Sequence, residues 1–306
     1  MIITFIIFFI TLFGIIFGAN NLVNGSCSIA RRFKISDFII GALIVGVGTS
    51  MPELVVSLMG TLQNNADIAI GNVVGSNIFN ILGILGLTAL IFPIPIQKKD
   101  NNFDIIFCIV VSVFLTLVMT LFSNGLNFYA GVILLILFGL YTWFSFIKNK
   151  DNNIISSNNL EPFWLSVLKI VGGLSILILS CEYFIKSSIL LAKDFGLSES
   201  VISLTLIACG TSLPELAASI VAAFKKNTQL ALGNIIGSNI FNITFILGLC
   251  SLFSPLNSIG IGIIDYYIMV GAALFVLLCA LFGKINRFFG FTMLLSFIIY
   301  TLYLIF

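Results

Sequence analysis

The chain has 306 residues, of which 59% are hydrophobic and 8% are charged, and its formal net charge is +2. Because about 25% of the residues of a typical soluble domain are charged, this composition excludes an ordinary soluble protein. The small net charge gives no indication of a nucleic-acid partner, and the absence of histidine from the sequence excludes imidazole metal sites and histidine-dependent catalysis. The six cysteines stand singly, without a CxxC pair, so we expect packing residues rather than disulfides or metal ligands.

Apolar segments follow one another along the chain, each near the roughly 20 residues that a helix needs to cross a bilayer. The first lacks a basic leading segment and a cleavage site, so we expect a retained span rather than a signal peptide. The predicted fold class is therefore an all-α polytopic membrane protein. Its ten transmembrane helices are expected at residues 2–23, 37–63, 67–92, 104–123, 126–147, 162–187, 198–225, 228–254, 262–283 and 286–306.

One long polar connection, residues 148–161, divides the chain into halves at 1–147 and 162–306, with five predicted spans in each. Basic residues are concentrated in every second connection between spans, and the linker 148–161 is one of these connections. By the positive-inside rule the crowded side is cytoplasmic, so both termini are predicted to be extracytoplasmic in a multi-pass protein of the cell membrane. The residues on the crowded side are Arg31, Arg32, Lys34, Lys98, Lys99, Lys148, Lys150, Lys225, Lys226, Lys284 and Arg287.

The two halves share a repeated sequence, because residues 41–86 recur at 203–248 with a constant offset of 162 residues. The first copy contains GTSMPE at 48–53 and GNVVGSNIFN at 71–80, and the second contains GTSLPE at 210–215 and GNIIGSNIFN at 233–242. An odd number of spans per half turns the second half upside down relative to the first. Such inverted repeats are typical of secondary transporters, whose sites form near the midplane from broken helices of both halves.

The first shared motif predicts a broken helix that carries a buried carboxylate. Pro52 has no N–H to donate to the carbonyl of Gly48, so the second span is expected to break at 48–52 and to leave free carbonyls. At membrane depth such carbonyls persist only where they line a wet cavity or hold an ion. Glu53 follows in the first turn of the next half-helix, where the helix dipole favours the ionised form. Pro214 and Glu215 repeat the arrangement.

The second shared motif predicts a polar stripe along the following span. Carboxylates, carbonyls, amides and hydroxyls make an oxygen-only ligand set, which favours Ca²⁺ or Na⁺ over zinc, copper or iron. Two carboxylates neutralise one Ca²⁺. Moving them through a low-dielectric transition without a bound cation is costly, so we expect a carrier that changes its orientation only when a cation is bound. The stripe consists of Asn72, Ser76 and Asn80 at i, i+4 and i+8, repeated as Asn234, Ser238 and Asn242.

The paired motifs resemble the alpha repeats of the Ca²⁺:cation antiporter superfamily, nearest its prokaryotic sodium/calcium exchanger branch. The resemblance implies a ten-helix fold in which the second, third, seventh and eighth helices build the site and the first and sixth slide across them. One departure is Asn242, where exchangers of this type often carry Asp. The calcium ligands it implies are Glu53, Glu215 and the carbonyls of Thr49 and Thr211; the sodium positions add Ser76, Ser238 and the carbonyls of Gly46 and Ala208, and Asn80 and Asn242 close the centre.

The expected function is a secondary active antiporter, not an enzyme, that exchanges Ca²⁺ for Na⁺ by alternating access in a lipid bilayer. No cofactor is expected beyond the transported ions, and a monomer is compatible with the sequence. The residues leave open Ca²⁺/H⁺ or K⁺-dependent exchange, as well as a passive cation channel, which the inverted repeat disfavours. Glu182, with Lys186 one helical turn further on, is interpreted as a surface ion pair, and the alternative is a gating role on a sliding helix.

Overall fold

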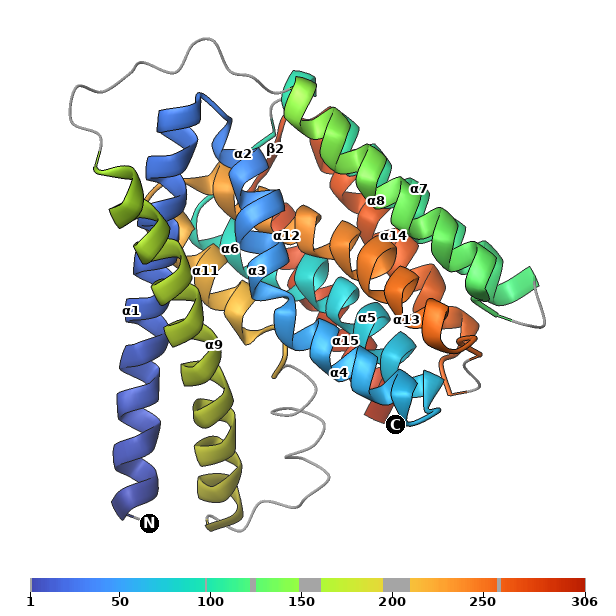
Figure 1. Ribbon diagram of the computed structural model, residues 1–306, viewed down its shortest axis with the longest axis horizontal. Helices are drawn as coiled ribbons and strands as arrows, with labels where there is room; N and C mark the ends of the chain where they lie inside the picture. Colours follow the sequence, from blue (N-terminus) through green and yellow to red (C-terminus); the bar gives the residue numbers. More distant parts are fainter. Residues whose placement is uncertain are drawn as a thin grey trace.

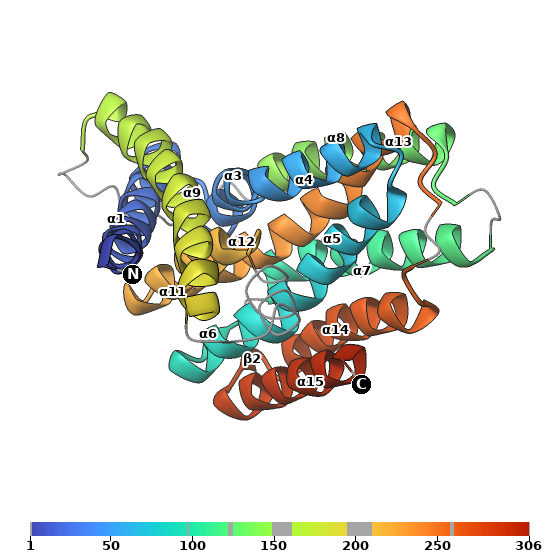
Figure 2. The same ribbon diagram turned by 90° about the horizontal axis from the view of Figure 1, so that it is seen from below.

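The computed structural model describes residues 2–96, 98–121, 125–148, 161–194, 210–257 and 260–305, and most of them are helical. Two long helices, α1 (Ile2–Phe33) and α9 (Phe163–Asp194), lie side by side at one edge of the molecule, and the other helices form a bundle beside them (Figures 1 and 2). Their backbones approach closely, since a Cβ placed on Gly18 would lie 2.8 Å from the Gly173 carbonyl oxygen. Such close approach at small residues is typical of membrane helix pairs.

The first half continues with two segmented helices and a helical hairpin. Side-chain caps begin both segmented helices, because Ser36 accepts a hydrogen bond from the backbone N–H of Ile39, and Asn65 accepts one from the N–H of Ile68. The first consists of α2 (Asp37–Ile40), the π-helical η1 (Gly41–Gly46), α3 (Val47–Thr49) and α4 (Met51–Leu62). The second consists of α5 (Ala66–Ile78), the π-helical η2 (Phe79–Leu85) and α6 (Gly86–Ile91), and the hairpin is α7 (Lys98–Leu121) with α8 (Phe128–Lys148).

The second half repeats this order where it is described. After α9 come α11 (Leu213–Phe224), then α12 (Thr228–Phe241), the π-helical η4 (Asn242–Leu247) and α13 (Gly248–Phe253), and finally α14 (Ile263–Leu281) and α15 (Arg287–Ile305). Two short strands, β1 (Ile94–Pro95) and β2 (Lys284–Ile285), pair antiparallel and join the connections of the two halves, with Ile94 opposite Ile285.

Nine of the ten predicted spans overlap helices that are long and apolar enough to cross a membrane. The described residues contain eight such single helices, or nine when Asp37–Thr49 and Met51–Leu62, which meet at an angle of 46°, count as one broken span. The predicted span at 198–225 is described only from residue 210 onward, so the count of ten stays a prediction. The helices α1 and α9 continue beyond the ends predicted for the first and sixth spans, to Phe33 and Asp194.

The helices that carry the polar motifs lie in the middle of the bundle. The segments α5–η2 and α12–η4 contribute much of the largest apolar cluster, and their buried side chains pack against α7 and α14. In α12 every residue from Leu230 to Phe241 is buried. Polar residues on these segments therefore cannot reach water at the surface, and each needs a partner inside the protein.

Candidate cation-binding site

Both buried carboxylates lie in the first turn of a helix that begins after a break. In the first half α3 ends at Thr49 and α4 begins at Met51, which confirms the break predicted at 48–52. The intervening Ser50 leaves helical geometry with φ −83° and ψ 10°. Ser212 has nearly the same geometry before α11, with φ −90° and ψ 9°. The proline of each motif therefore stands in the first turn of the new helix, where its missing N–H costs nothing.

The two carboxylates are fully buried and are held by serines of the opposite half. Ser212 donates to Oε1 of Glu53 at 2.9 Å, and Ser50 donates to Oε1 of Glu215 at 2.8 Å. Each carboxylate is thus tied to the helix break of the opposite half. In the described part of the chain, neither forms an ion pair with a lysine or arginine. Their negative charge is therefore not neutralised by a basic side chain there, and a bound cation would neutralise it.

Four asparagines form a second layer where the segment α5–η2 meets the segment α12–η4. Asn77 and Asn239 donate to each other's backbone carbonyls at 3.2 and 3.1 Å. Asn80 donates to Oδ1 of Asn239 at 3.0 Å, and Asn242 donates to Oδ1 of Asn77 at 3.1 Å. Because the amide nitrogens of Asn80 and Asn242 are used in these bonds, their orientation leaves the two side-chain oxygens available as acceptors.

Among the described residues, four of these buried oxygen atoms have no hydrogen-bond donor: Oε2 of Glu53, Oε2 of Glu215, Oδ1 of Asn80 and Oδ1 of Asn242. A buried acceptor without a partner costs about 1–3 kcal/mol, and more when it is charged. The four form two pairs of repeat mates, so each half supplies one carboxylate and one amide oxygen. Uncompensated oxygens from carboxylates and amides are the ligands that hard cations prefer.

Asparagines of the central helices also hold the two helix breaks in place. Asn234 donates to the carbonyl of Glu215 at 3.2 Å and accepts from the hydroxyl of Thr49 at 3.2 Å. In the other half, Asn72 donates to the carbonyl of Glu53 at 3.1 Å and accepts from the hydroxyl of Thr211 at 3.3 Å. These bonds fix the first turn of α4 and of α11 against the central helices, and so they position the carboxylates.

The structure gives contacts for some of the remaining predicted ligands and not for others. Ser238 donates to the carbonyl of Gly46 at 3.1 Å, and that carbonyl also accepts from the backbone N–H of Ser50 at 3.1 Å. Ser76 is buried. Ala208 lies outside the described residues. Glu53, Glu215, Asn80 and Asn242 thus each have a buried oxygen without a donor among the described residues, and the ligand roles, including the sodium positions, stay predictions.

The sequence prediction missed the residues that cross between the halves, namely Ser50, Ser212, Asn77 and Asn239. All four stand inside the duplicated motifs, and each has an identical mate at the offset of 162 residues. Identity between the two copies at buried polar positions was therefore the signal that could have identified them.

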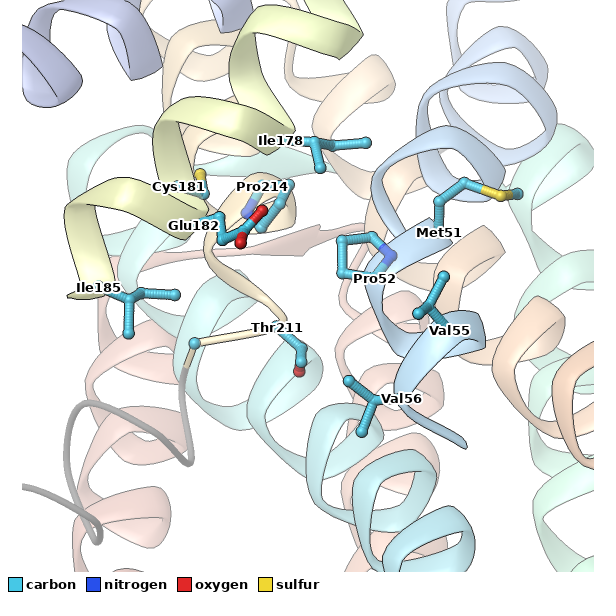
Figure 3. Close-up of a pocket in the computed structure, with 11 residues that line it drawn as sticks. Met51, Pro52, Val55, Val56, Ile178, Cys181, Glu182, Ile185, Thr211 and Pro214 are labelled. Atoms are coloured by element: carbon cyan, nitrogen blue, oxygen red, sulfur yellow. The ribbon is translucent and has the colours of Figure 1, made fainter. Parts of the chain in front are cut away.

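A cavity of about 550 Å³ approaches the site between α4 and α9. Pro52 and Pro214, which directly precede the two carboxylates in sequence, line it together with Thr211 and apolar side chains such as Val55 and Ile178 (Figure 3). Residues at both helix breaks thus line this space.

The family model for "Sodium/calcium exchanger protein" matches residues 3–147 and 165–306, which is nearly the whole chain. The chain belongs to the sodium/calcium exchanger family. This exchanger is 38% identical over 307 residues to the putative antiporter CaxA of Alkalimonas amylolytica, with 95% of each chain covered. It is 32% identical over 294 residues to the sodium/calcium exchanger MaX1 of Methanosarcina acetivorans, with 82% of this chain and 84% of MaX1 covered.

The exchanger also matches a solved structure over its full length. The sodium-calcium exchanger NCX_Mj, soaked with zero Na⁺ and Ca²⁺, superposes with a TM-score of 0.86 at 34% identity, and 97% of each chain is covered. At this identity the likeness extends beyond the fold to the family. The protein is therefore a prokaryotic sodium/calcium exchanger-like cation antiporter, a multi-pass membrane protein from a family of transporters rather than enzymes.

Proposed function

We propose that this antiporter exchanges Ca²⁺ for Na⁺ across the cell membrane by alternating access. The observation that carries the proposal is the set of four buried oxygens that have no donor in the described part of the chain, and they belong to Glu53, Glu215, Asn80 and Asn242. Their two carboxylates supply the charge that one Ca²⁺ or two Na⁺ neutralise. An unloaded site would carry two uncompensated charges through a low-dielectric transition, so reorientation requires a cation and the transport is an exchange.

The ligand roles follow from which oxygens are free. Glu53, Glu215, Asn80 and Asn242 contact Ca²⁺ directly, and the carbonyls of Thr49 and Thr211 complete its shell. Flexible oxygen ligands of this kind suit the variable coordination of Ca²⁺. The Na⁺ ions use the same carboxylates and the outlying oxygens of Ser76, Ser238, Gly46 and Ala208.

The architecture that we propose is ten spans in two inverted halves, 1–147 and 162–306, joined by a cytoplasmic linker at 148–161. Two observations support it. Each bond between a serine and a site carboxylate, and each bond between central asparagines, has a counterpart at the offset of 162 residues. The beginning of α1 and the end of α15 also lie toward the same end of the molecule in Figure 1, as extracytoplasmic termini require.

Ca²⁺/H⁺ exchange is the second candidate, and one observation favours it. Since neither Glu53 nor Glu215 has a basic partner among the described residues, each carboxylate can take up a proton in place of a metal ion. Two protons would then balance one Ca²⁺. K⁺-dependent exchange is tested by the same experiment, because it differs only in the gradient that drives uptake.

The test is the uptake of radioactive calcium into proteoliposomes on which Na⁺, H⁺ and K⁺ gradients are imposed one at a time. The proposal expects uptake with an outward Na⁺ gradient alone. Uptake driven only by a pH gradient would establish the second candidate instead, and uptake that needs K⁺ together with Na⁺ would establish K⁺-dependent exchange.

Site variants make the same experiment specific. Removing one partner of a buried charge pair costs about 3–5 kcal/mol, so Glu53→Gln and Glu215→Gln are each expected to slow exchange about a hundredfold or more. The matched control is Glu161→Gln, the same chemical change at a carboxylate that pairs with Lys169 outside the site. Exchange at the wild-type rate in either site variant would contradict the ligand assignment.

A further inference from the structure

One residue that lines the cavity between α4 and α9, Glu182, carries a charge and lies outside the two repeated motifs. Among the described residues that line it, Glu182 alone is charged, and its carboxylate extends from α9 into the cavity (Figure 3). The other lining side chains are mostly apolar, such as Val55, Val56 and Ile185. A cation that approaches Pro52 and Pro214 through this space therefore passes one fixed negative charge.

The negative charge is present in one half of the molecule only. The repeat mate of Glu182 is Asn20 on α1. A cavity of about 420 Å³ lies beside Asn20, and there the charged lining residue is Lys225. Moreover, α1 packs along α11. Their repeat mates, α9 and α4, make few contacts with each other, because the larger cavity lies between them. The side that is open in this structure is thus the side that has the acidic residue.

Lys186 holds the carboxylate of Glu182 but does not enclose it. The two charged atoms are 2.5 Å apart, and 60% of the Lys186 side chain and 52% of the Glu182 side chain are exposed. An exposed pair of this kind contributes little to the stability of a fold. The Lys186 ammonium also lies 5.3 Å from the centre of the Tyr183 ring, so a cation–π partner is available when the carboxylate binds another cation.

We propose that Glu182 is a cation-capture residue at the mouth of the access route, and that Lys186 competes with the entering cation for its carboxylate. This proposal depends on the proposed exchange function. A fixed charge at the mouth of a low-dielectric cleft raises the local concentration of counter-ions and hence their rate of entry. Glu182 therefore sets how fast Ca²⁺ reaches the site from the cavity side, while the four central oxygens set how tightly it binds.

The experiment measures initial Ca²⁺ uptake at limiting and at saturating Ca²⁺ in oriented membrane vesicles, at low and at high ionic strength. Taking about 10 Å as the mean separation at which one charge in water attracts an approaching divalent ion, Glu182→Gln should lower the rate at limiting Ca²⁺ about fourfold at low ionic strength. The rate at saturation should be unchanged, and the effect should fade at high salt because screening removes it. It should appear only when Ca²⁺ enters from the cavity side.

Lys186→Gln supplies the decisive comparison, because it removes the competing ammonium and should raise the same rate. A merely structural ion pair would make both variants change the rate in the same direction, or leave it unchanged, and either result would overturn the proposal. Glu161→Gln, the same neutralisation away from the cavity, should have no effect. If wild-type vesicles show no cation exchange under any gradient, the exchange function itself is wrong; if they exchange and Glu182→Gln matches wild type from both sides, only the capture role is wrong.

Discussion

Gly237 and its repeat mate Gly75 allow one substitution to be compared in two environments. A Cβ on Gly237 would overlap the backbone of Ala42, with the Ala42 carbonyl carbon 2.7 Å away. A Cβ on Gly75 meets no described atom within 4 Å. Both glycines have helical surroundings, in α12 and α5, so the intrinsic helix propensity changes equally when either becomes alanine.

The magnitude follows from these two terms. Replacing a helical glycine by alanine stabilises a helix by about 1 kcal/mol, and Gly75→Ala should show this gain. Forcing a methyl group against backbone that cannot yield costs about 1–3 kcal/mol or more, so Gly237→Ala should be destabilised by about 0–2 kcal/mol after the same gain. At about 2–4 °C for each kcal/mol, the melting midpoints of the two variants should differ by about 2–12 °C, with Gly75→Ala higher.

Thermal unfolding of the purified variants in one detergent and at one heating rate measures this difference, since apparent midpoints depend on the scan rate. Transport gives a second readout, because a shift of η1 away from α12 would break the bond between Ser238 and the Gly46 carbonyl. A midpoint of Gly237→Ala above that of the wild-type protein would refute the close backbone packing of η1 on α12.

Three further substitutions test the site. Ser50→Ala and Ser212→Ala each remove a hydroxyl that orients a buried carboxylate, so calcium titrations of uptake should show about tenfold weaker half-saturation in both; a change in only one would contradict their equivalence. Asn242→Asp adds a third carboxylate, so protons should compete with Ca²⁺ more strongly than in wild type. The acid limb of the pH profile of uptake should therefore move to higher pH. An unchanged acid limb would place residue 242 away from the cation. The bond from Lys225 to Asn24 holds α11 against α1, so cysteines at these two positions should be joined at rest by a bifunctional thiol reagent that spans about the length of a lysine side chain. Cysteines at their mates, Gln63 and Lys186, should be joined only during turnover. Gel mobility of cysteine-depleted protein reports both, and equal yields at rest would contradict the asymmetry.

The local features of the site could be predicted from the sequence, because they depend on backbone chemistry. Pro52 dictates the helix break, and the regular spacing of polar residues places Asn80 on an inward face. The hydrogen bonds that cross between the halves could not be predicted in this way. Asn77, which an ideal helix places beside the stripe, bonds to the backbone carbonyl of Asn239 in the other half, and no pattern within one motif indicates that partner. The π-helical segments η2 and η4 begin only at Phe79 and Asn242, and the spacing of the stripe does not predict them either.

The hydrogen bonds between the halves join residues that are 159–165 positions apart, a separation that local sequence patterns do not reveal. Ser212 is separated from Glu53 by 159 residues and Ser50 from Glu215 by 165, so no local pattern links either pair. The repeat constrains them all the same: once one serine is placed on the opposite carboxylate, the offset of 162 residues requires the second bond. The symmetry, and not the spacing within one motif, determines the site.

A symmetric site inside asymmetric surroundings is what alternating access needs. The four central oxygens are related in pairs, so the cation experiences nearly the same ligands whichever side is open. The asymmetry lies where α1 and α9 meet the rest of the molecule. Lys225 donates to the Asn20 carbonyl and to Asn24, which joins α11 to α1. Lys186, the repeat mate of Asn24, donates to Glu182 on its own helix instead. If the halves exchange roles, Gln63 takes the place of Lys225, and Lys186 that of Asn24. Lys186 would then donate to Gln63 and leave Glu182, so the same lysine that competes with entering cations would help to close the route behind them.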